Sequence, residues 1–108
     1  MARIAKRLAG PALVTNSAAT VYTVPSSTKA VVRHIHVQNP TGSSVAFTIS
    51  IGTDAAGTRL FDAYVIAAGT VLDHYGAYVL SAAEIIQAVA GTNNVLTLTI
   101  SGDEIVSD

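Results

Sequence analysis

The chain of 108 residues contains no cysteine and no tryptophan, and only 12% of its residues are charged. Without cysteine it can form no disulfide, no thiolate metal site and no iron–sulfur cluster. Its formal net charge of −1 lacks the basic excess that phosphate contacts require, so we expect no nucleic-acid partner. No run of about twenty uncharged apolar residues occurs, so we also expect no membrane span. The basic start is followed by a short apolar stretch that Gly10-Pro11 interrupts, which argues against a secretory signal.

What the chain has in abundance is β-branched side chains, because Val, Ile and Thr make up 34 of its 108 residues. Their stiff side chains suit a pleated sheet better than a helix. Residues 45–51 and 95–100 alternate large apolar with small or polar side chains, which is typical of a strand with one buried face. We therefore predict one all-β domain, an antiparallel β-sandwich for which a jelly roll is one possible topology. Further strands are expected at about residues 19–24, 30–38, 59–66, 70–74, 76–80 and 85–89.

A short internal echo supports the sandwich. Residues 64–73 and 78–87 share one pattern, in which a strand, a corner of small residues and a second strand follow each other. Two adjacent corners of this kind predict that the chain crosses twice between two sheets. Residues 81–90 also fit a helix, with a Ser cap and Glu84 at the capping-box position, but the echo favours a strand.

The charges are distributed unevenly along the chain. Residues 1–59 hold six basic side chains and one acidic one, for +5, whereas residues 60–108 hold six acidic side chains and no Lys or Arg, for −6. We predict a basic N-terminal arm over residues 1–11 and a sandwich domain over residues 12–108, with the arm docking on an acidic neighbour. The alternative is a solvated, frayed terminus. The arm residues expected to bind the partner are Arg3, Ile4, Lys6, Arg7 and Leu8.

One pair of side chains offers possible metal ligands. His34 and His36 are two residues apart on a predicted strand, so both imidazoles share one face. Two ligands do not make a site, and a third would have to come from His74, for example, or from a symmetry copy in a trimer. We favour the simpler interpretation, in which these histidines belong to the polar face of the strand. We therefore expect neither a metal nor another cofactor.

Catalytic and sugar-binding patterns are weak. Asp73 and His74 are neighbours on a predicted strand, so they point to opposite faces and would not form a catalytic dyad. The acidic pair Asp103-Glu104 fits a solvated turn near the end of the chain rather than a pair of catalytic carboxylates. We therefore predict that the protein is not an enzyme. A carbohydrate-binding module remains an alternative, with Tyr75 and Tyr78 as the aromatic platform.

The stretch VYTVPSSTKAVVRHIHVQNPTG, residues 21–42, carries a resemblance to a known class of proteins. With the strand at 45–51 and the Ala-Ala-Gly-Thr corner at 67–70, it resembles small, cysteine-free β-sandwich structural proteins of bacteriophage virions. The likeness spans about residues 19–105 and consists of strands and turns, so it transfers no active site.

The resemblance implies a structural role in a phage particle, made in the host cytoplasm. A capsid decoration or minor capsid protein is the first expectation, and a tail component is the second. The resemblance further implies contacts with other virion proteins, the major capsid protein first, and a homo-oligomer. A trimer or a hexamer would match a symmetry axis of the capsid, and we favour the trimer. The low charge agrees with this role, since part of the apolar surface should then lie in interfaces.

Overall fold

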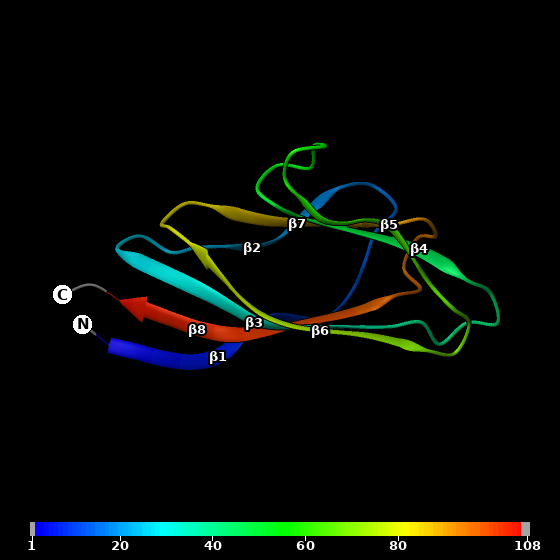
Figure 1. Cartoon of the computed structure of the whole chain (residues 1–108), viewed down its shortest axis with the longest axis horizontal. Coiled ribbons are helices and arrows are strands. Elements are labelled where there is room, and N and C mark those ends of the chain that lie inside the picture. Colours follow the sequence, from blue (N-terminus) through cyan, green and yellow to red (C-terminus); the bar gives the residue numbers. More distant parts are fainter. Residues whose placement is uncertain (1, 107–108) are drawn as a thin grey trace.

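The computed structural model describes residues 2–106, which form eight strands in two stacked layers (Figure 1). The described part of the chain has no helix with the length and hydrophobicity that a membrane crossing requires. The strands are β1 (Ala2–Leu13), β2 (Ala19–Thr23), β3 (Thr28–Gln38), β4 (Val45–Ile51), β5 (Arg59–Ile66), β6 (Val71–Leu80), β7 (Ile85–Ala90) and β8 (Thr97–Val106).

The two layers are four-stranded sheets in which all pairs of neighbouring strands are antiparallel. Sheet A has the order β1-β8-β3-β6, and sheet B has the order β2-β7-β4-β5. Along the chain every connection except β4 to β5 passes from one sheet to the other. This order is that of an eight-stranded jelly roll. The structure thus confirms the predicted antiparallel β-sandwich.

The internal echo corresponds to two of these crossings. Residues 67–70 carry the chain from β5 in sheet B to β6 in sheet A, and residues 81–84 return it to β7 in sheet B. Both corners are β-turns, closed by hydrogen bonds from Thr70 N to Ala67 O (3.2 Å) and from Glu84 N to Ser81 O (3.1 Å). The helical alternative for residues 81–90 does not form.

The core lies between the sheets and follows the predicted alternation. In β4 the buried side chains include Phe47 and Ile49, both fully inaccessible to solvent. Leu96, Leu98 and Ile100 are likewise at most 1% exposed, as their even positions predicted. Each sheet therefore has one apolar face, and the two apolar faces pack against each other.

Two strand predictions were wrong in their boundaries. Segments 70–74 and 76–80 form one strand, β6, because the register shift between Tyr75 and Tyr78 accommodates one extra residue as a bulge. The turn expected at Asp103-Glu104 does not form, because β8 continues through these residues to its end at residue 106. Both acidic side chains are buried, and each is paired with basic or hydroxyl groups from distant parts of the sequence.

The predicted arm is extended, but it is an edge strand of the sandwich rather than a segment outside it. β1 pairs with β8 from Ala2↔Val106 to Leu13↔Thr97 and therefore crosses the boundary expected after residue 11. Its register shifts twice, around Leu8 and around Gly10-Pro11. Within the chain, the acidic side chains that the basic residues of β1 contact lie on β8.

Candidate functional sites

The five residues expected to bind a partner lie on β1 in different environments. Arg3 and Lys6 make ion pairs with β8, from Arg3 Nη2 to Asp103 Oδ2 (2.8 Å) and from Lys6 Nζ to Glu104 Oε1 (3.2 Å). Leu8 is 8% exposed and belongs to the core, whereas Ile4 and Arg7 are exposed. A partner contact through β1 remains a prediction, and Leu8 would not be available to it.

The two buried carboxylates of β8 have different partners. Asp103 accepts hydrogen bonds from Arg33 Nε (2.5 Å) and Arg3 Nη2 (2.8 Å), which lower its pKa below the usual range. Glu104 lies between the layers, where the Tyr22 hydroxyl on β2 donates to it, and this bond is the main reason that its pKa is lowered. The pKa of Tyr22 is raised, first by burial and then by the neighbouring carboxylate. The acidic pair is therefore part of the fold's internal contacts.

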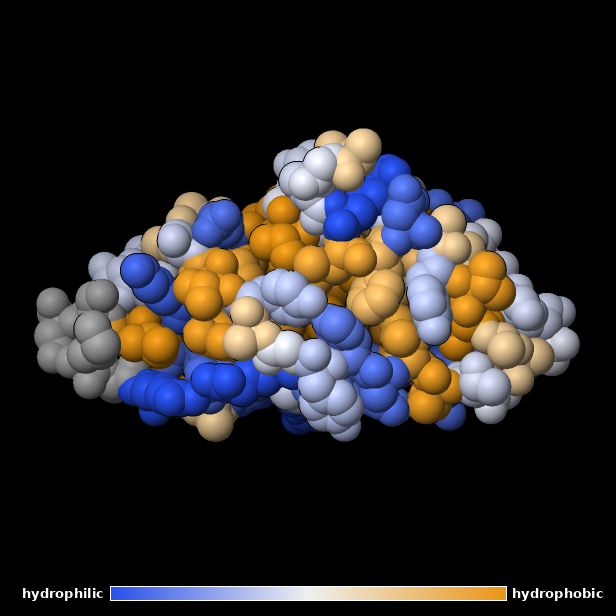
Figure 2. Space-filling view, viewed as in Figure 1, coloured by the Kyte–Doolittle hydropathy of each residue, from blue (hydrophilic) through white to orange (hydrophobic). Residues whose placement is uncertain are grey.

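One side of the sandwich, where β5 and β6 form the sheet edges, carries an aromatic seam. The Phe61 ring of sheet B packs edge to face against the Tyr64 ring, with the ring centroids 5.4 Å apart. It also packs edge to face against the His74 ring of sheet A, with centroids 5.0 Å apart. His74 Nε2 in turn lies 2.7 Å from the Tyr78 hydroxyl. Figure 2 shows hydrophobic side chains in a band between the layers on the side nearest the viewer. Five of the seven large hydrophobic side chains that are exposed lie on these two strands: Tyr64, Val65, Val71, Tyr75 and Val79.

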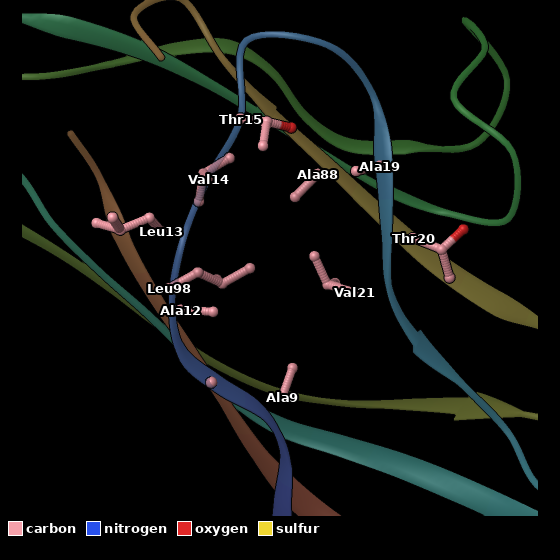
Figure 3. A pocket seen from close by; sticks show the side chains of 11 residues that line it. Ala9, Ala12, Leu13, Val14, Thr15, Ala19, Thr20, Val21, Ala88 and Leu98 are labelled. Carbon is pink, nitrogen blue, oxygen red and sulfur yellow. The ribbon is translucent and has the colours of Figure 1, made fainter. Parts of the chain in front are cut away.

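The opposite side, between β1 and β2, has an apolar groove. Its volume is about 290 Å³, and its walls are mostly small or apolar residues of β1, the β1–β2 connection and β2. In Figure 3 the side chains of Ala12, Val21, Ala88 and Leu98 point into the groove. The groove exists because alanine fills several of these positions, so the two sheets do not close over the core at this edge.

A third feature is a cluster of histidine and carboxylate on the outer face of sheet A. His34 and His36 lie on β3 and share this face, as predicted, and the register sets Asp73 of β6 opposite His36. Asp73 Oδ1 lies 2.8 Å from His34 Nε2 and 2.6 Å from His36 Nδ1. Both contacts lower the pKa of Asp73, and the contact with His36 has the larger effect. The sequence interpretation suggested His74 as a possible third ligand, but His74 points into the seam.

Two other pairs of nearby residues, Asp73 with His74 and Tyr75 with Tyr78, point in different directions in the structure. Asp73 and His74 point to opposite faces of β6, as expected, so they form no dyad. Tyr75 stacks on His34 at the outer face (centroids 4.3 Å apart, planes at 4°), whereas Tyr78 points into the seam. Tyr75 and Tyr78 therefore do not make the shared platform expected for sugar binding.

Comparisons with known proteins point to the fold alone. No family model matches the chain, and no curated protein matches it in sequence. Among solved structures, a chain of a Bacillus endospore appendage, described as belonging to a novel family of disulfide-linked pili, is similar with a TM-score of 0.56. The match covers 98% of this chain and 89% of the pilus chain at 13% identity. The two proteins share an all-β architecture, and the neighbour is a structural appendage protein.

Proposed function

We propose that this protein is a non-enzymatic structural subunit that assembles head to tail with copies of itself, and that the assembly belongs to a bacteriophage virion. The observation that carries the self-assembly is that exposed apolar surface gathers at two pairs of edge strands, β5 with β6 and β1 with β2. The exposed apolar side chains are concentrated along β5 and β6, and an apolar groove lies at β1 and β2. Exposed patches of this kind on a small protein mark interaction surfaces.

The two sides are also complementary in backbone and in charge. β1 and β6 are long edge strands of sheet A, each with one side that has no partner strand among the described residues. β1 and β2 contain no acidic residue and three basic ones, of which Arg3 and Lys6 pair with β8 and Arg7 is exposed. β5 and β6 contain Asp62 and Asp73 against one base, Arg59. A second copy presenting its β5–β6 side to the β1–β2 side of the first would bring apolar surface and opposite charges together.

A contact between two different surfaces is heterologous, so it yields a closed ring or an open filament. The smallest ring compatible with the virion proposal is the expected trimer. The similar pilus subunit belongs to an appendage described as disulfide-linked. This chain has no cysteine, so its assembly would not use disulfides.

Sedimentation velocity on the intact protein tests the self-assembly. We expect the wild-type chain to form an oligomer and Val79→Lys on β6 or Ala12→Lys in the groove to give monomers. Ala56→Lys, in the exposed β4–β5 loop, is the matched control and should leave the oligomer unchanged. A wild-type protein that stays monomeric at 100 µM, or a lysine variant at either side that still assembles, would refute the proposal.

Mixing the two blocked variants tests the head-to-tail geometry. Val79→Lys keeps an intact groove and Ala12→Lys keeps an intact β5–β6 side, so an equimolar mixture should form a one-to-one dimer and nothing larger. If the interface instead joined the same surface on both copies, the variant in which that surface is intact would dimerise alone, and mixing would give no new complex.

The virion part of the proposal rests on the sequence resemblance and is tested separately. Quantitative mass spectrometry of purified phage particles gives the copy number relative to the major capsid protein. A number comparable to that of the major capsid protein supports capsid decoration, on the virion surface, with the major capsid protein as partner. A few copies per particle support a tail component, and absence from the particles discards the virion assignment.

A further inference from the structure

Three side chains on the outer face of sheet A are arranged as a set of metal ligands. His34, His36 and Asp73 each offer one ligand atom, a ring nitrogen or a carboxylate oxygen, and these three atoms all lie within 4.8 Å of one another. They come from two hydrogen-bonded strands, β3 and β6, and Asp73 lies between the two histidines, touching both. Imidazole nitrogen and carboxylate oxygen are the donors that Zn²⁺ and other divalent transition ions accept.

The backbone and one aromatic ring hold these ligands in place. β3 is an inner strand, paired with β8 on one side and β6 on the other, so the Cα positions of His34 and His36 are fixed on both flanks. The Tyr75 ring stacks on the His34 ring and thus sets its orientation. Ligands on paired strands with supported rotamers are better preorganised than ligands on loops.

The surroundings favour a cation. On the β8 flank, Thr99 lies opposite His36 and Ser101 opposite His34, so the groups across this face are neutral hydroxyls. The adjacent cation, Arg33, is engaged by Asp103, with Nε 2.5 Å from Oδ2. The three ligand side chains are between 28% and 38% exposed, which leaves them open to entry of an ion from solvent.

We propose that His34, His36 and Asp73 bind one divalent transition-metal ion per chain, with Zn²⁺ as the preferred ion and water completing its coordination. Around Zn²⁺ with bonds of about 2.0–2.1 Å, neighbouring ligand atoms in a tetrahedron lie about 3.3 Å apart. The present separations of 2.6 and 2.8 Å are hydrogen-bond distances. Loading therefore replaces the bridging protons by the ion and moves the nitrogens of His34 and His36 about 0.5 and 0.7 Å away from the carboxylate, respectively.

Isothermal titration of untagged protein with ZnCl₂ at pH 7.5 tests this site. We expect saturable binding of one ion per chain, weakened at least tenfold in Asp73→Asn and in His36→Ala. His74→Gln is the matched control, since His74 lies on the same strand but points to the other face, and it should bind Zn²⁺ as the wild type does. Titration at pH 5.5 should weaken binding, because protonated imidazoles do not ligate metals.

Co²⁺ supplies a spectroscopic readout that is independent of heat. The wild-type protein should give visible d–d absorption on addition of Co²⁺, and Zn²⁺ should abolish it by displacement. Circular dichroism of each variant establishes that it is folded before titration. The proposal is overturned if folded wild-type protein shows no saturable binding at 100 µM Zn²⁺. It is equally overturned if the stoichiometry differs from one, or if binding persists in Asp73→Asn and His36→Ala.

Discussion

The hydroxyl of Tyr22 on β2 donates a hydrogen bond to the carboxylate of Glu104 on β8 across the two layers, at 2.5 Å. Lys6 Nζ on β1 approaches the other oxygen of the same carboxylate at 3.2 Å. One buried acidic side chain thus joins two strands of sheet A to one strand of sheet B. This hydrogen bond links the two sheets on the side of the sandwich that carries the β1–β2 groove.

Tyr22→Phe removes the donor of this bond while keeping the ring in the core. We expect a loss of about 1.5–3 kcal/mol in the free energy of unfolding, because a hydrogen bond to a buried charged group is lost. Urea denaturation measures it. Tyr75→Phe is the matched control, since Tyr75 is 72% exposed, and it should change stability by less than about 0.5 kcal/mol. Equal effects of the two substitutions would contradict this role for Tyr22.

Stability should fall in acid because of the paired carboxylates. Asp103 and Glu104 have pKa values below their usual range in the folded protein, so the unfolded chain binds protons first as the pH falls. Their contribution is complete above about pH 5 and is lost as the pH falls through the folded pKa values. Urea midpoints measured from pH 7 to pH 2.5 should show this decline, and Asp103→Asn should flatten it. Identical midpoints at both ends of this range would contradict the prediction.

The two similar corners, residues 67–70 and 81–84, predict that Ala-to-Gly in one and Gly-to-Ala in the other change the stability in opposite directions. Gly69 and Ala83 occupy the same position of their turns and have positive φ angles of 67° and 72°. Ala83→Gly should therefore stabilise the protein by about 0.5–1 kcal/mol, because an L-residue is strained in this region. Gly69→Ala should destabilise it by a similar amount, since beyond the two neighbouring residues no atom lies within 4 Å of the added methyl and only the backbone cost remains. Thermal denaturation of both variants measures the two signs, and two changes of the same sign would refute the argument.

A pair of leucines tests whether β1 is part of the core or a detachable arm. Leu8 is 8% exposed and Leu13 is 57% exposed, although both lie on β1. Leu8→Ala should cost about 2–4 kcal/mol through the cavity it leaves, whereas Leu13→Ala should cost well under 1 kcal/mol. Chemical denaturation of the two variants makes the comparison. If Leu8→Ala were as mild as Leu13→Ala, β1 would contribute little to the core.

Alternation and turn chemistry made most of the sandwich predictable. Phe47 and Ile49 were assigned to the buried face from their odd positions alone, because a strand with one wet face has a period of two. The crossings at 67–70 and 81–84 were readable because both corners repeat the same arrangement of small residues. Local sequence patterns report local geometry, and these features are local.

Features that depend on distant pairing were not readable from the sequence. Asp103 looked solvated because its partners, Arg3 and Arg33, are far away along the chain. The basic residues of β1 looked like a docking arm for the same reason. At the metal cluster, the spacing of His34 and His36 indicated a shared face, but the third ligand required the β3–β6 register, which a bulge shifts. The sequence alone therefore shows Asp73 only as a neighbour of His74.

The pairing of β1 with β8 also bears on how the protein is made. Ala2 lies opposite Val106, so β1 and β8 are neighbours in sheet A although nearly the whole chain separates them in sequence. At typical translation rates, roughly ten seconds pass between the synthesis of β1 and the emergence of β8 from the ribosome. During that interval the nascent chain exposes Leu8 and the basic side chains of β1 without their partners. Sheet A can therefore be completed only after β8 has emerged, and until then β1 has no partner strand in its own sheet.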